Sequence, residues 1–393
     1  MYYIADGKDI EGGKVSDIYF LRTKKILEEK KIDPYVKAEI SIKCLPDGYR
    51  WGVLAGIEES LSLLSCADML DVKCMPEGSI FFNGEPVMEI EGKYSSFGLY
   101  ETAVLGFLCH SSAVATKAAR CKIAAGDRIV FNFGARRAHP AIAPMIERCA
   151  YIGGLDGVST VIGAERIGME PVGTMPHALI LIMGSTVDAT QAFDEIIEKT
   201  VKRISLIDTF NDEKFEAINV SDALGPRLYG IRLDTPSSRR GSFKKIIEEV
   251  RWELDIRGYS DVKIIASGGL DEDDIKKLNH VVDSYGIGTA ISSAKVFDFA
   301  LDIVEIENTK IAKRGKMSGA KKVLRCPSCF SDMVVLQKDS ATFDCKKCAI
   351  RYADIFVDAI TGGRLSYKLP SSKKIRDFVM SQYKYLNIDQ GFK

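Results

Sequence analysis

Apolar and polar positions alternate in two different ways along the chain, and the difference predicts where strands and helices lie. Short runs such as RIVFNFG (128–134) place apolar residues at every second position, as a half-buried strand does. Longer runs such as FKKIIEEVRWEL (243–254) place them at helical spacing, which predicts an amphipathic helix on a core. From 113 to 295 the two kinds of run follow one another in turn.

This alternation predicts the fold class. Strands that alternate with helices are typical of parallel β/α units, and this many units favour a closed or nearly closed, irregular β/α barrel over a doubly wound sheet. The expected strands are 128–134, 170–175, 205–210, 228–234, 261–269 and 284–291. The expected helices are 155–168, 192–204, 212–224, 242–258 and 271–280.

The two flanking regions have different patterns of apolar and polar residues. Residues 1–112 mix short alternating runs with Gly and Pro turns, which predicts an N-terminal α/β sandwich domain, and NGEP (83–86) predicts a hairpin. Residues 296–393 are more basic and contain two close cysteine pairs. We therefore expect an α/β protein of three domains, 1–112, 113–295 and 296–393.

Composition narrows the class of function. The counts of basic and acidic residues are equal, 54 each, which argues against bulk nucleic-acid binding. The start, MYYIADGKDIEGG, has early acids and no apolar core, so no signal peptide is expected, and ALILIMG (178–184) is too short to cross a bilayer. Six cysteines stand singly in apolar segments, as buried thiols do, and we expect a cytoplasmic protein.

Charged side chains follow the expected strands. In a β/α barrel the carboxyl ends of the strands meet at one rim and build the active site. Two guanidiniums there can grip a carboxylate or phosphate, and carboxylates can hold ribose hydroxyls and Mg²⁺. Helix capping would explain each carboxylate separately. The predicted convergence of cations and carboxylates on one rim instead indicates a binding or catalytic site. Its candidate members are Arg136, Arg137, His139, His177, Asp208, Arg232 and Asp234.

Glycines end the last two expected strands, in SGG (267–269) and GIGT (286–289). Such turns let backbone N–H groups approach a phosphate, although each alone could be a simple tight turn. Together with the cations and carboxylates they suit transfer of a phosphorylated sugar, in which displacement at the anomeric carbon passes through an oxocarbenium-like state.

Nine short motifs then place the chain beside a known family. They are SDIY, ETAVLGFLCHSSAVAT, FGARRAH, GGLDGVSTV, GTMPHA, LIDTF, IRLD, SGGLDE and GIGTAIS, and they run in the family's order from about residue 15 to 325. In these motifs the chain resembles nicotinate phosphoribosyltransferase and, more broadly, the type II phosphoribosyltransferases. The resemblance implies an open α/β sandwich, an irregular barrel, and active sites shared between subunits of a homo-oligomer built from dimers. SGGLDE is closer to the quinolinate and nicotinamide enzymes, whereas GTMPHA and the chain length favour nicotinate.

The resemblance also implies a base site. Phe133 would stack on the pyridine ring, and Tyr19 of another subunit on its other face. Arg136 would lie along the acidic substituent, Arg137 would grip the ligand or brace the loop, and Asp156 would approach the base.

The remaining roles concern the phosphorylated substrates. Arg232 and Asp234, with Asp208, would serve phosphoribosyl pyrophosphate and its Mg²⁺, and His177 would accept a phosphoryl group from ATP. The 5′-phosphate would bind at Gly268, Gly269, Gly288 and Thr289.

The cysteine pairs predict a metal site. Cys326 and Cys329, then Cys345 and Cys348, have zinc-ribbon spacing, and a closed shell of four thiolates is structural rather than catalytic. A redox dithiol is the simpler alternative, but it needs only one pair. The ribbon and KRGKMSGAKKVLR leave open a nucleic-acid-binding module on a degenerate barrel, or a nucleotide sensor.

Overall fold

The structure is a computed structural model that describes residues 2–234, 241–388 and 391–392. The chain forms two compact units, one made of residues 1–116 with 295–393 and the other of residues 117–294. The C-terminal segment groups with the N-terminal one, and the division into three domains at 112 and 295 remains a prediction.

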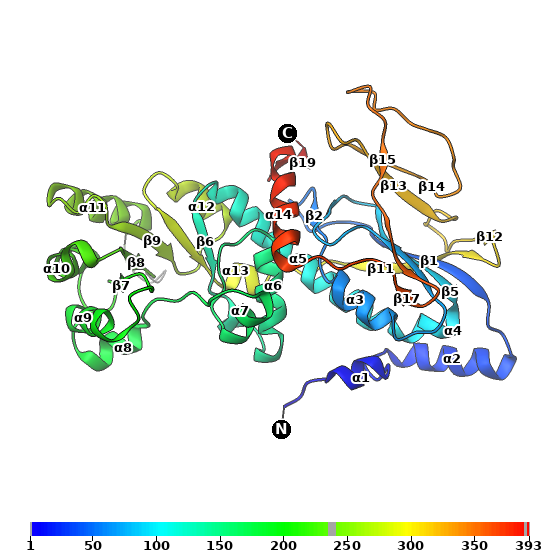
Figure 1. Cartoon of the computed structure of the whole chain (residues 1–393), viewed down its shortest axis with the longest axis horizontal. Helices are drawn as coiled ribbons and strands as arrows, with labels where there is room; N and C mark the ends of the chain where they lie inside the picture. The colour runs from blue at the N-terminus through cyan, green and yellow to red at the C-terminus, as the bar shows by residue number, and fades with distance from the viewer. Residues whose placement is uncertain (1, 235–240, 389–390, 393) are drawn as a thin grey trace. The chain divides into compact units, whose positions relative to one another are not determined.

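A seven-stranded antiparallel sheet forms the centre of the first unit (Figure 1). Its order is β12-β11-β1-β5-β3-β16-β17, so strands from both ends of the chain share it. The alternating run at 35–42 buries Val36, Ala38 and Ile40 on one face of β1, as its pattern requires. The strands are β1 Tyr35–Ile42, β3 Asp71–Cys74, β5 Pro86–Lys93, β11 Phe299–Ile306, β12 Thr309–Lys310, β16 Val357–Thr361 and β17 Arg364–Leu365.

Helices and short ladders complete this unit, and the long helix α5 (Glu101–Ala125) continues into the second. The hairpin predicted at 83–86 is wrong: the chain turns there, but β4 pairs with β2 whereas β5 pairs with β1 and β3. The helices are α1 Gly7–Glu11, α2 Ile18–Lys30, α3 Ile57–Leu64, α4 Tyr94–Phe97 and α14 Ser372–Gln382. The two-stranded ladders join β2 Gly52–Val53 to β4 Ile80–Phe81 and β18 Leu386–Asn387 to β19 Gly391–Phe392.

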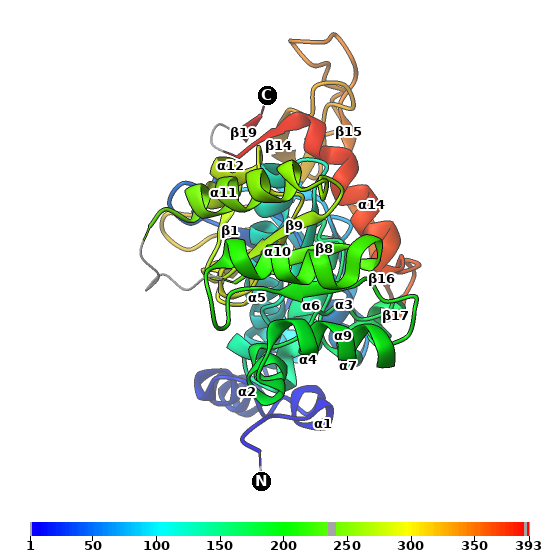
Figure 2. The same cartoon turned by 90° about the vertical axis from the view of Figure 1, so that its left-hand side faces the viewer.

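The second unit is a parallel sheet with helices, which confirms the predicted α/β class. The strand order is β6-β10-β9-β8-β7. The central strands β9 and β10 are buried on both faces, as parallel strands covered by helices are, and Figures 1 and 2 show α10 and α11 outside β8 and β9. The strands are β6 Ile129–Asn132, β7 Ile204–Leu206, β8 Gly230–Leu233, β9 Lys263–Ser267 and β10 Ser284–Ile287. The helices are α6 Ala143–Ile152, α7 Val161–Ile167, α8 His177–Met183, α9 Thr186–Ile196, α10 Glu213–Leu224, α11 Phe243–Ile256, α12 Glu272–Leu278 and α13 Thr289–Ser292.

The barrel closes irregularly. Residues 170–175 were expected to be a strand, but they have no assigned strand or helix although the structure describes all of them. Instead Gly157 bridges to Phe131 of β6, and the Val172 N–H donates to the Val158 carbonyl at 2.7 Å. On the far side Arg232 of β8 donates to Thr174 at 2.8 Å. Single backbone and side-chain contacts thus connect residues 157–174 to β6 and β8 where a ladder was predicted.

One predicted helix is displaced. Residues 192–204 were expected to be helical, whereas α9 begins at Thr186, where the Ser185 side chain caps it, and ends at Ile196. The guanidinium of Arg203 binds carbonyls of the segment that follows the helix, including those of Ile197 and Glu198. These contacts satisfy the carbonyls without further helix.

The cysteine pairs lie in a small three-stranded sheet of order β14-β13-β15. The first pair follows β13 (Lys321–Arg325) and precedes β14 (Asp332–Leu336). The second pair precedes β15 (Ala353–Asp354). This arrangement of two turns beside three strands is a ribbon.

Candidate active site

Four of the predicted residues meet at the carboxyl ends of β7 and β8. Asp208 follows β7, Arg232 and Asp234 lie at the end of β8, and His177 begins α8. His177 Nε2 is 3.7 Å from Asp208 Oδ1 and 3.9 Å from Asp234 Oδ2. The Asp234 N–H donates to Asp208 Oδ2 at 3.1 Å, which ties the two strand ends together.

Asp208 is the most buried member of this group. Its side chain is 2% exposed, and Oδ1 has no hydrogen-bond partner among the described residues. Burial raises the pKa of the Asp208 carboxyl, and Asp234 adds to this rise while His177 opposes it. A buried acceptor without a donor, at the rim of a barrel, is a place where a cation or a ligand donor completes the structure.

Arg232 is held in one orientation. Its Nε donates to Ser267 Oγ at 2.9 Å, Nη1 to Thr174 Oγ1 at 2.8 Å, and Nη2 to Asp234 Oδ2 at 3.0 Å. The guanidinium carbon also lies 5.2 Å from the centre of the Phe133 ring. A guanidinium fixed on three sides is preorganised for an anion.

Phe133 follows β6, and its ring lies against β10. A β-carbon at Gly286 would come within 2.4 Å of that ring, so only glycine leaves it room. The Phe133 N–H donates to the Ile287 carbonyl at 2.8 Å. The ring therefore has a fixed place beside Arg232, where a flat base can stack.

The glycine turn after β9 approaches the end of β8. Gly268 and Gly269 have φ of 94° and 76°, in the left-handed region that glycine tolerates best. A β-carbon on Gly268 would lie 3.1 Å from the Asp234 carbonyl oxygen. Gly288 precedes α13, and Thr289, its first residue, is exposed. The structure thus brings the first glycine pair next to Asp234.

The arginines of the loop after β6 are exposed. Arg136 and Arg137 lie in the short 3₁₀ turn Ala135–Arg137, and neither guanidinium has a partner among the described residues. His139 has a local role instead, because its Nδ1 accepts from the Ala141 N–H at 3.2 Å. Both guanidiniums are thus accessible to a ligand, and the roles of Arg136 and Arg137 stay predictions.

Asp156 forms contacts near the start of β6. Its Oδ2 accepts from Lys122 Nζ at 2.8 Å and from the Val130 N–H at 2.9 Å, near the start of β6. The carboxylate therefore anchors the amino end of a strand, whereas the reaction rim lies at the carboxyl ends. The approach of Asp156 to the base, which the resemblance implies, stays a prediction.

Tyr19 lies on α2 in the first unit. Its side chain is 56% exposed, and its hydroxyl donates to Asp17 Oδ2 at 3.3 Å. Its ring is 4.3 Å from that of Phe20. An exposed aromatic at a helix start is available to another molecule.

Three hydroxyl residues that the sequence reasoning missed contact the predicted ones. Thr174 and Ser267 bind Arg232, and Thr209 Oγ1 is 3.0 Å from His177 Nδ1. Each lies within the last three residues of an expected strand, so position near the rim was the available signal. Their small neutral side chains drew no attention beside the charges.

The four predicted cysteines come together. One ligand atom from each of Cys326, Cys329, Cys345 and Cys348 lies within 4.8 Å of the others. The two turns share a geometry: Phe330 and Ala349 both have positive φ, and their N–H groups donate to Cys326 and Cys345 carbonyls at 3.0 and 2.8 Å. These four thiols can hold a metal ion.

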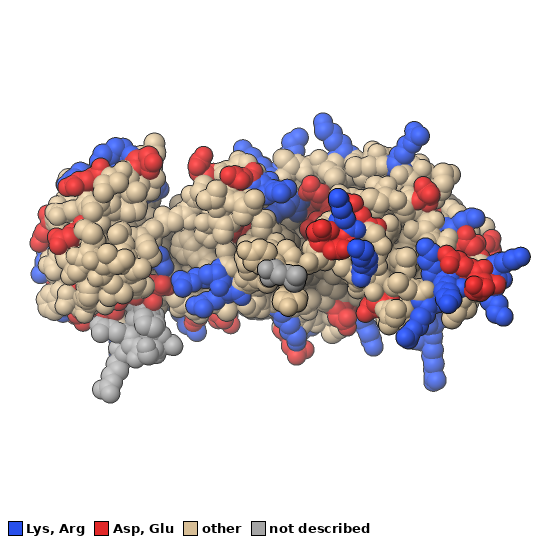
Figure 3. Space-filling view, turned by 90° about the horizontal axis from the view of Figure 1, so that it is seen from below, with Lys and Arg blue, Asp and Glu red and all other residues tan. Residues whose placement is uncertain are grey.

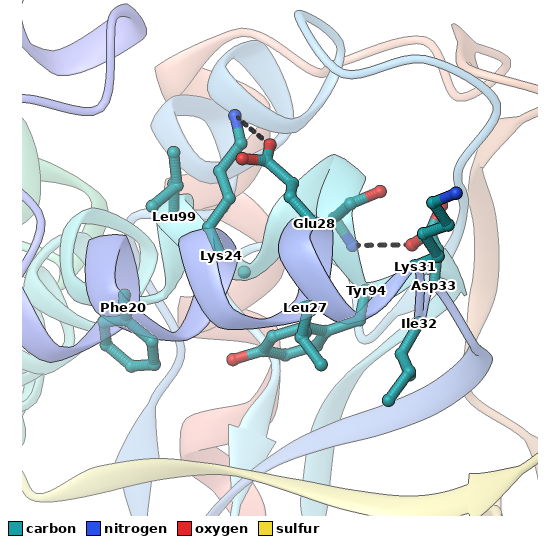
Figure 4. A pocket seen from close by; sticks show the side chains of 11 residues that line it. Phe20, Lys24, Leu27, Glu28, Lys31, Ile32, Asp33, Tyr94 and Leu99 are labelled. Carbon is teal, nitrogen blue, oxygen red and sulfur yellow. Dashed lines mark hydrogen bonds and ion pairs between the residues drawn. The ribbon is translucent and has the colours of Figure 1, made fainter.

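The first unit has surface hollows of its own. A hollow of about 210 Å³ in the first unit lies under α2 and is lined mainly by apolar side chains such as Phe20, Leu27 and Tyr94 (Figure 4). It contains none of the predicted reactive residues. Positive and negative side chains are interspersed over the face in Figure 3, without a continuous basic tract. Among the described residues no helix is both apolar enough and long enough for a membrane span.

Comparison with known proteins identifies the family. The model of the quinolinate phosphoribosyl transferase N-terminal domain matches residues 17–112, and that of the C-terminal domain matches 114–302. The chain is 53% identical to the crystal structure of nicotinate-nucleotide pyrophosphorylase from Pyrococcus furiosus, with 98% of both chains covered and a TM-score of 0.95. It shares its fold with human nicotinic acid phosphoribosyltransferase, at 18% identity, 96% of both chains and a TM-score of 0.76.

Curated relatives agree. Nicotinate phosphoribosyltransferase pncB1 of Mycobacterium tuberculosis is 29% identical over 326 residues, which are 73% of this chain and 72% of that protein. The nicotinate phosphoribosyltransferase of Bacillus subtilis is 35% identical over 226 residues, 56% of this chain and 45% of that protein. The resemblance drawn from the motifs is confirmed: the chain belongs to the type II phosphoribosyltransferase family of the nicotinate and quinolinate enzymes, and it is a phosphoribosyltransferase.

Proposed function

We propose that the chain transfers the phosphoribosyl group of phosphoribosyl pyrophosphate to nicotinate, which yields nicotinate mononucleotide and pyrophosphate for NAD biosynthesis. The observation that carries the proposal is the cluster of His177, Asp208, Arg232 and Asp234 beside the glycine turn. Nicotinate is favoured over nicotinamide and quinolinate because the curated relatives act on nicotinate by name.

The rim residues would each bind a different part of phosphoribosyl pyrophosphate. Asp208 and Asp234 would hold the ribose hydroxyls and Mg²⁺, and the unpartnered Asp208 Oδ1 fits a cation. Mg²⁺ would stabilise the departing pyrophosphate. Arg232 would bind oxygens of the same group, while Gly268 and Gly269 with Gly288 and Thr289 would receive the 5′-phosphate through backbone N–H groups.

The base would lie beside Phe133. Its ring is fixed against Gly286, and the exposed guanidinium of Arg136 would pair with the carboxylate of nicotinate. Arg137 would assist or bind phosphate. A second carboxylate, as in quinolinate, would need a second set of cations besides Arg136 and Arg137. The sequence does not place one, which supports the monoacid.

We also propose that ATP hydrolysis drives the reaction through His177. Its side chain is 40% exposed, so a γ-phosphate could reach the ring. His177→Asn should then lose the stimulation by ATP and keep slow transfer without it. A wild-type rate that ignores ATP, with no acid-labile label from γ-labelled ATP, would contradict this part.

The metal at the ribbon would be Zn²⁺, since four thiolates in two matching turns suit its tetrahedral, sulfur-rich coordination. The active sites would be shared between subunits of a homo-oligomer, because Tyr19 is exposed and the outer side of α8 presents Leu181 and Ile182 at 58% and 84% exposure. The six cysteines outside the ribbon form no disulfide among the described residues, which supports a cytoplasmic location.

One assay separates the alternatives. Radiolabelled nicotinate, nicotinamide and quinolinate are each incubated with phosphoribosyl pyrophosphate and Mg²⁺, with and without ATP. Labelled nucleotide from nicotinate alone supports the proposal. Product from another base reassigns the substrate, and no product with any base would favour a nucleotide sensor or a nucleic-acid-binding protein.

A further inference from the structure

The hydroxyl of Ser267 lies between two residues of the proposed site. It is the last residue of β9, immediately before the glycine turn, and it is 2% exposed. Ser267 Oγ is 2.9 Å from Arg232 Nε and 3.0 Å from Asp234 Oδ1. Both partners come from the neighbouring strand β8 or its end, so one hydroxyl joins two strands and the turn.

The direction of these two hydrogen bonds is settled by chemistry. A guanidinium can only donate, so Ser267 Oγ must accept from Arg232. Its single proton is then free for the Asp234 carboxylate, although the Leu233 carbonyl at 3.3 Å is a weaker competitor. Arg232 therefore donates to Ser267, and Ser267 donates to Asp234. Removing the hydroxyl breaks both hydrogen bonds.

Arg232 has N–H groups that remain for a ligand. Of the five N–H groups of a guanidinium, Ser267, Thr174 and Asp234 take one each. The other two, one on each terminal nitrogen, have no partner among the described residues. If Nε were not held by Ser267, the group could turn about its stem and lose the alignment of those two donors.

We propose that Ser267 is a positioning residue that locks Arg232 and Asp234, so that the two remaining N–H groups of Arg232 bind the pyrophosphate of the substrate or product. This inference rests on the proposed function, since it assumes that a pyrophosphate binds at this rim. Ser267 itself touches no ligand, and it acts only through the two charged side chains.

The test measures binding of inorganic pyrophosphate with Mg²⁺ by calorimetry on the full-length protein. Ser267→Ala should weaken binding roughly tenfold. The variant loses the charge-assisted hydrogen bond to Arg232 Nε that aligns the two remaining N–H groups with the pyrophosphate. Ser267→Thr, which keeps the hydroxyl, should restore most of the loss. Equal affinity for Ser267→Ala and wild type would overturn the inference, while a wild type that binds no pyrophosphate would sink the proposed function first.

Ser205→Ala is the matched control. Ser205 is also a fully buried strand hydroxyl of the same sheet, and its Oγ is 2.7 Å from Thr190 Oγ1, away from the charged group. It should lower the melting temperature without changing pyrophosphate affinity. If both serine variants weaken binding alike, Ser267 has only a general structural role.

A double-mutant cycle tests whether Ser267 acts through Arg232. A lysine offers no Nε donor and no fork, so Arg232→Lys removes the group that Ser267 aligns. In that background Ser267→Ala should change pyrophosphate affinity less than about twofold, because coupled residues are not additive. A full tenfold loss in both backgrounds would show that the serine acts by another route.

Discussion

Gly286 and Phe133 are in such close contact that a β-carbon on the glycine would lie 2.4 Å from the ring. The ring takes the space that a side chain on β10 would fill. It also lies under the guanidinium of Arg232, at 5.2 Å from the guanidinium carbon. The position of the base in the proposed site thus depends on Gly286, because glycine has no side chain.

Gly286→Ala should displace the Phe133 ring. Overpacking of this kind costs about 1–3 kcal/mol, and we expect the KM for nicotinate to rise roughly tenfold. The KM for phosphoribosyl pyrophosphate should rise less, because the added β-carbon meets Ser267 Cβ, the link to Arg232 and Asp234, only at 3.2 Å, against 2.4 Å for the Phe133 ring. Gly106→Ala, where a β-carbon meets nothing within 4 Å, is the control and should leave both constants unchanged.

Arg136→Ala should remove selectivity for an acidic pyridine. A charge-assisted contact in a desolvated pocket is worth about 2–5 kcal/mol, so the KM for nicotinate should rise at least thirtyfold or so. Steady-state kinetics with each substrate varied separately measure the effect. An equal rise for phosphoribosyl pyrophosphate would reassign Arg136 to phosphate binding, and Arg166→Ala on the exposed face of α7 controls for lost surface charge.

The sequence predicted part of the fold and part of the site. The five parallel strands were predictable because each is a short apolar run followed by polar or glycine residues. The closure at 170–175 was not, since it depends on single contacts such as Val172 with Val158 and Thr174 with Arg232. The contact of Asp156 with Lys122 was not predictable either, because the two residues are 34 positions apart in the sequence.

The hairpin at 83–86 failed for a similar reason. Turn residues fix the local reversal of the chain, but they do not decide which strand each arm pairs with. Here β5 is buried between β1 and β3, and the burial of its apolar residues outweighs the local pairing. Ser267 was overlooked because a serine takes its role only from the charged groups that the fold brings to it.

The ribbon should contain about one zinc ion per chain, and its loss should loosen the C-terminal segment. Cys329→Ser removes one thiolate from the four, so elemental analysis should find little zinc, and limited proteolysis should cut within residues 321–365. The barrel chemistry should be largely kept. Cys66→Ser, at an exposed single cysteine, should retain the metal. Full metal content in Cys329→Ser would contradict the site.

Glu85 should make stability depend on pH. Burial, with the nearby Asp332 carboxylate, raises the pKa of Glu85 from 4.5 to about 8. Between these values the folded protein holds a proton that the unfolded chain has released, so this group lowers the free energy of unfolding as the pH rises. The loss begins near 4.5 and is complete above about 8.

Glu85→Gln cannot ionise and should escape that loss. Its stability relative to wild type, from urea melts, should increase across this pH window and level off above about 8. Glu165→Gln, on the exposed side of α7, should show no such trend. A constant difference between Glu85→Gln and wild type at every pH would mean that the pKa of Glu85 is the same in the folded and unfolded protein.

Tyr19 should complete the active site of another subunit. Tyr19→Ala and Asp234→Ala should each be inactive alone, because the first removes the stacking ring and the second a rim carboxylate. When the two variants exchange subunits, a hybrid dimer has one site with both groups intact and one with neither. Random exchange in a twofold dimer should restore about a quarter of the wild-type activity. Asp208→Ala mixed with Asp234→Ala is the control, since both defects lie in the same unit and every site then has one of them. No recovery for Tyr19→Ala with Asp234→Ala, despite exchange proven with differently tagged chains, would show that each site is built from a single subunit.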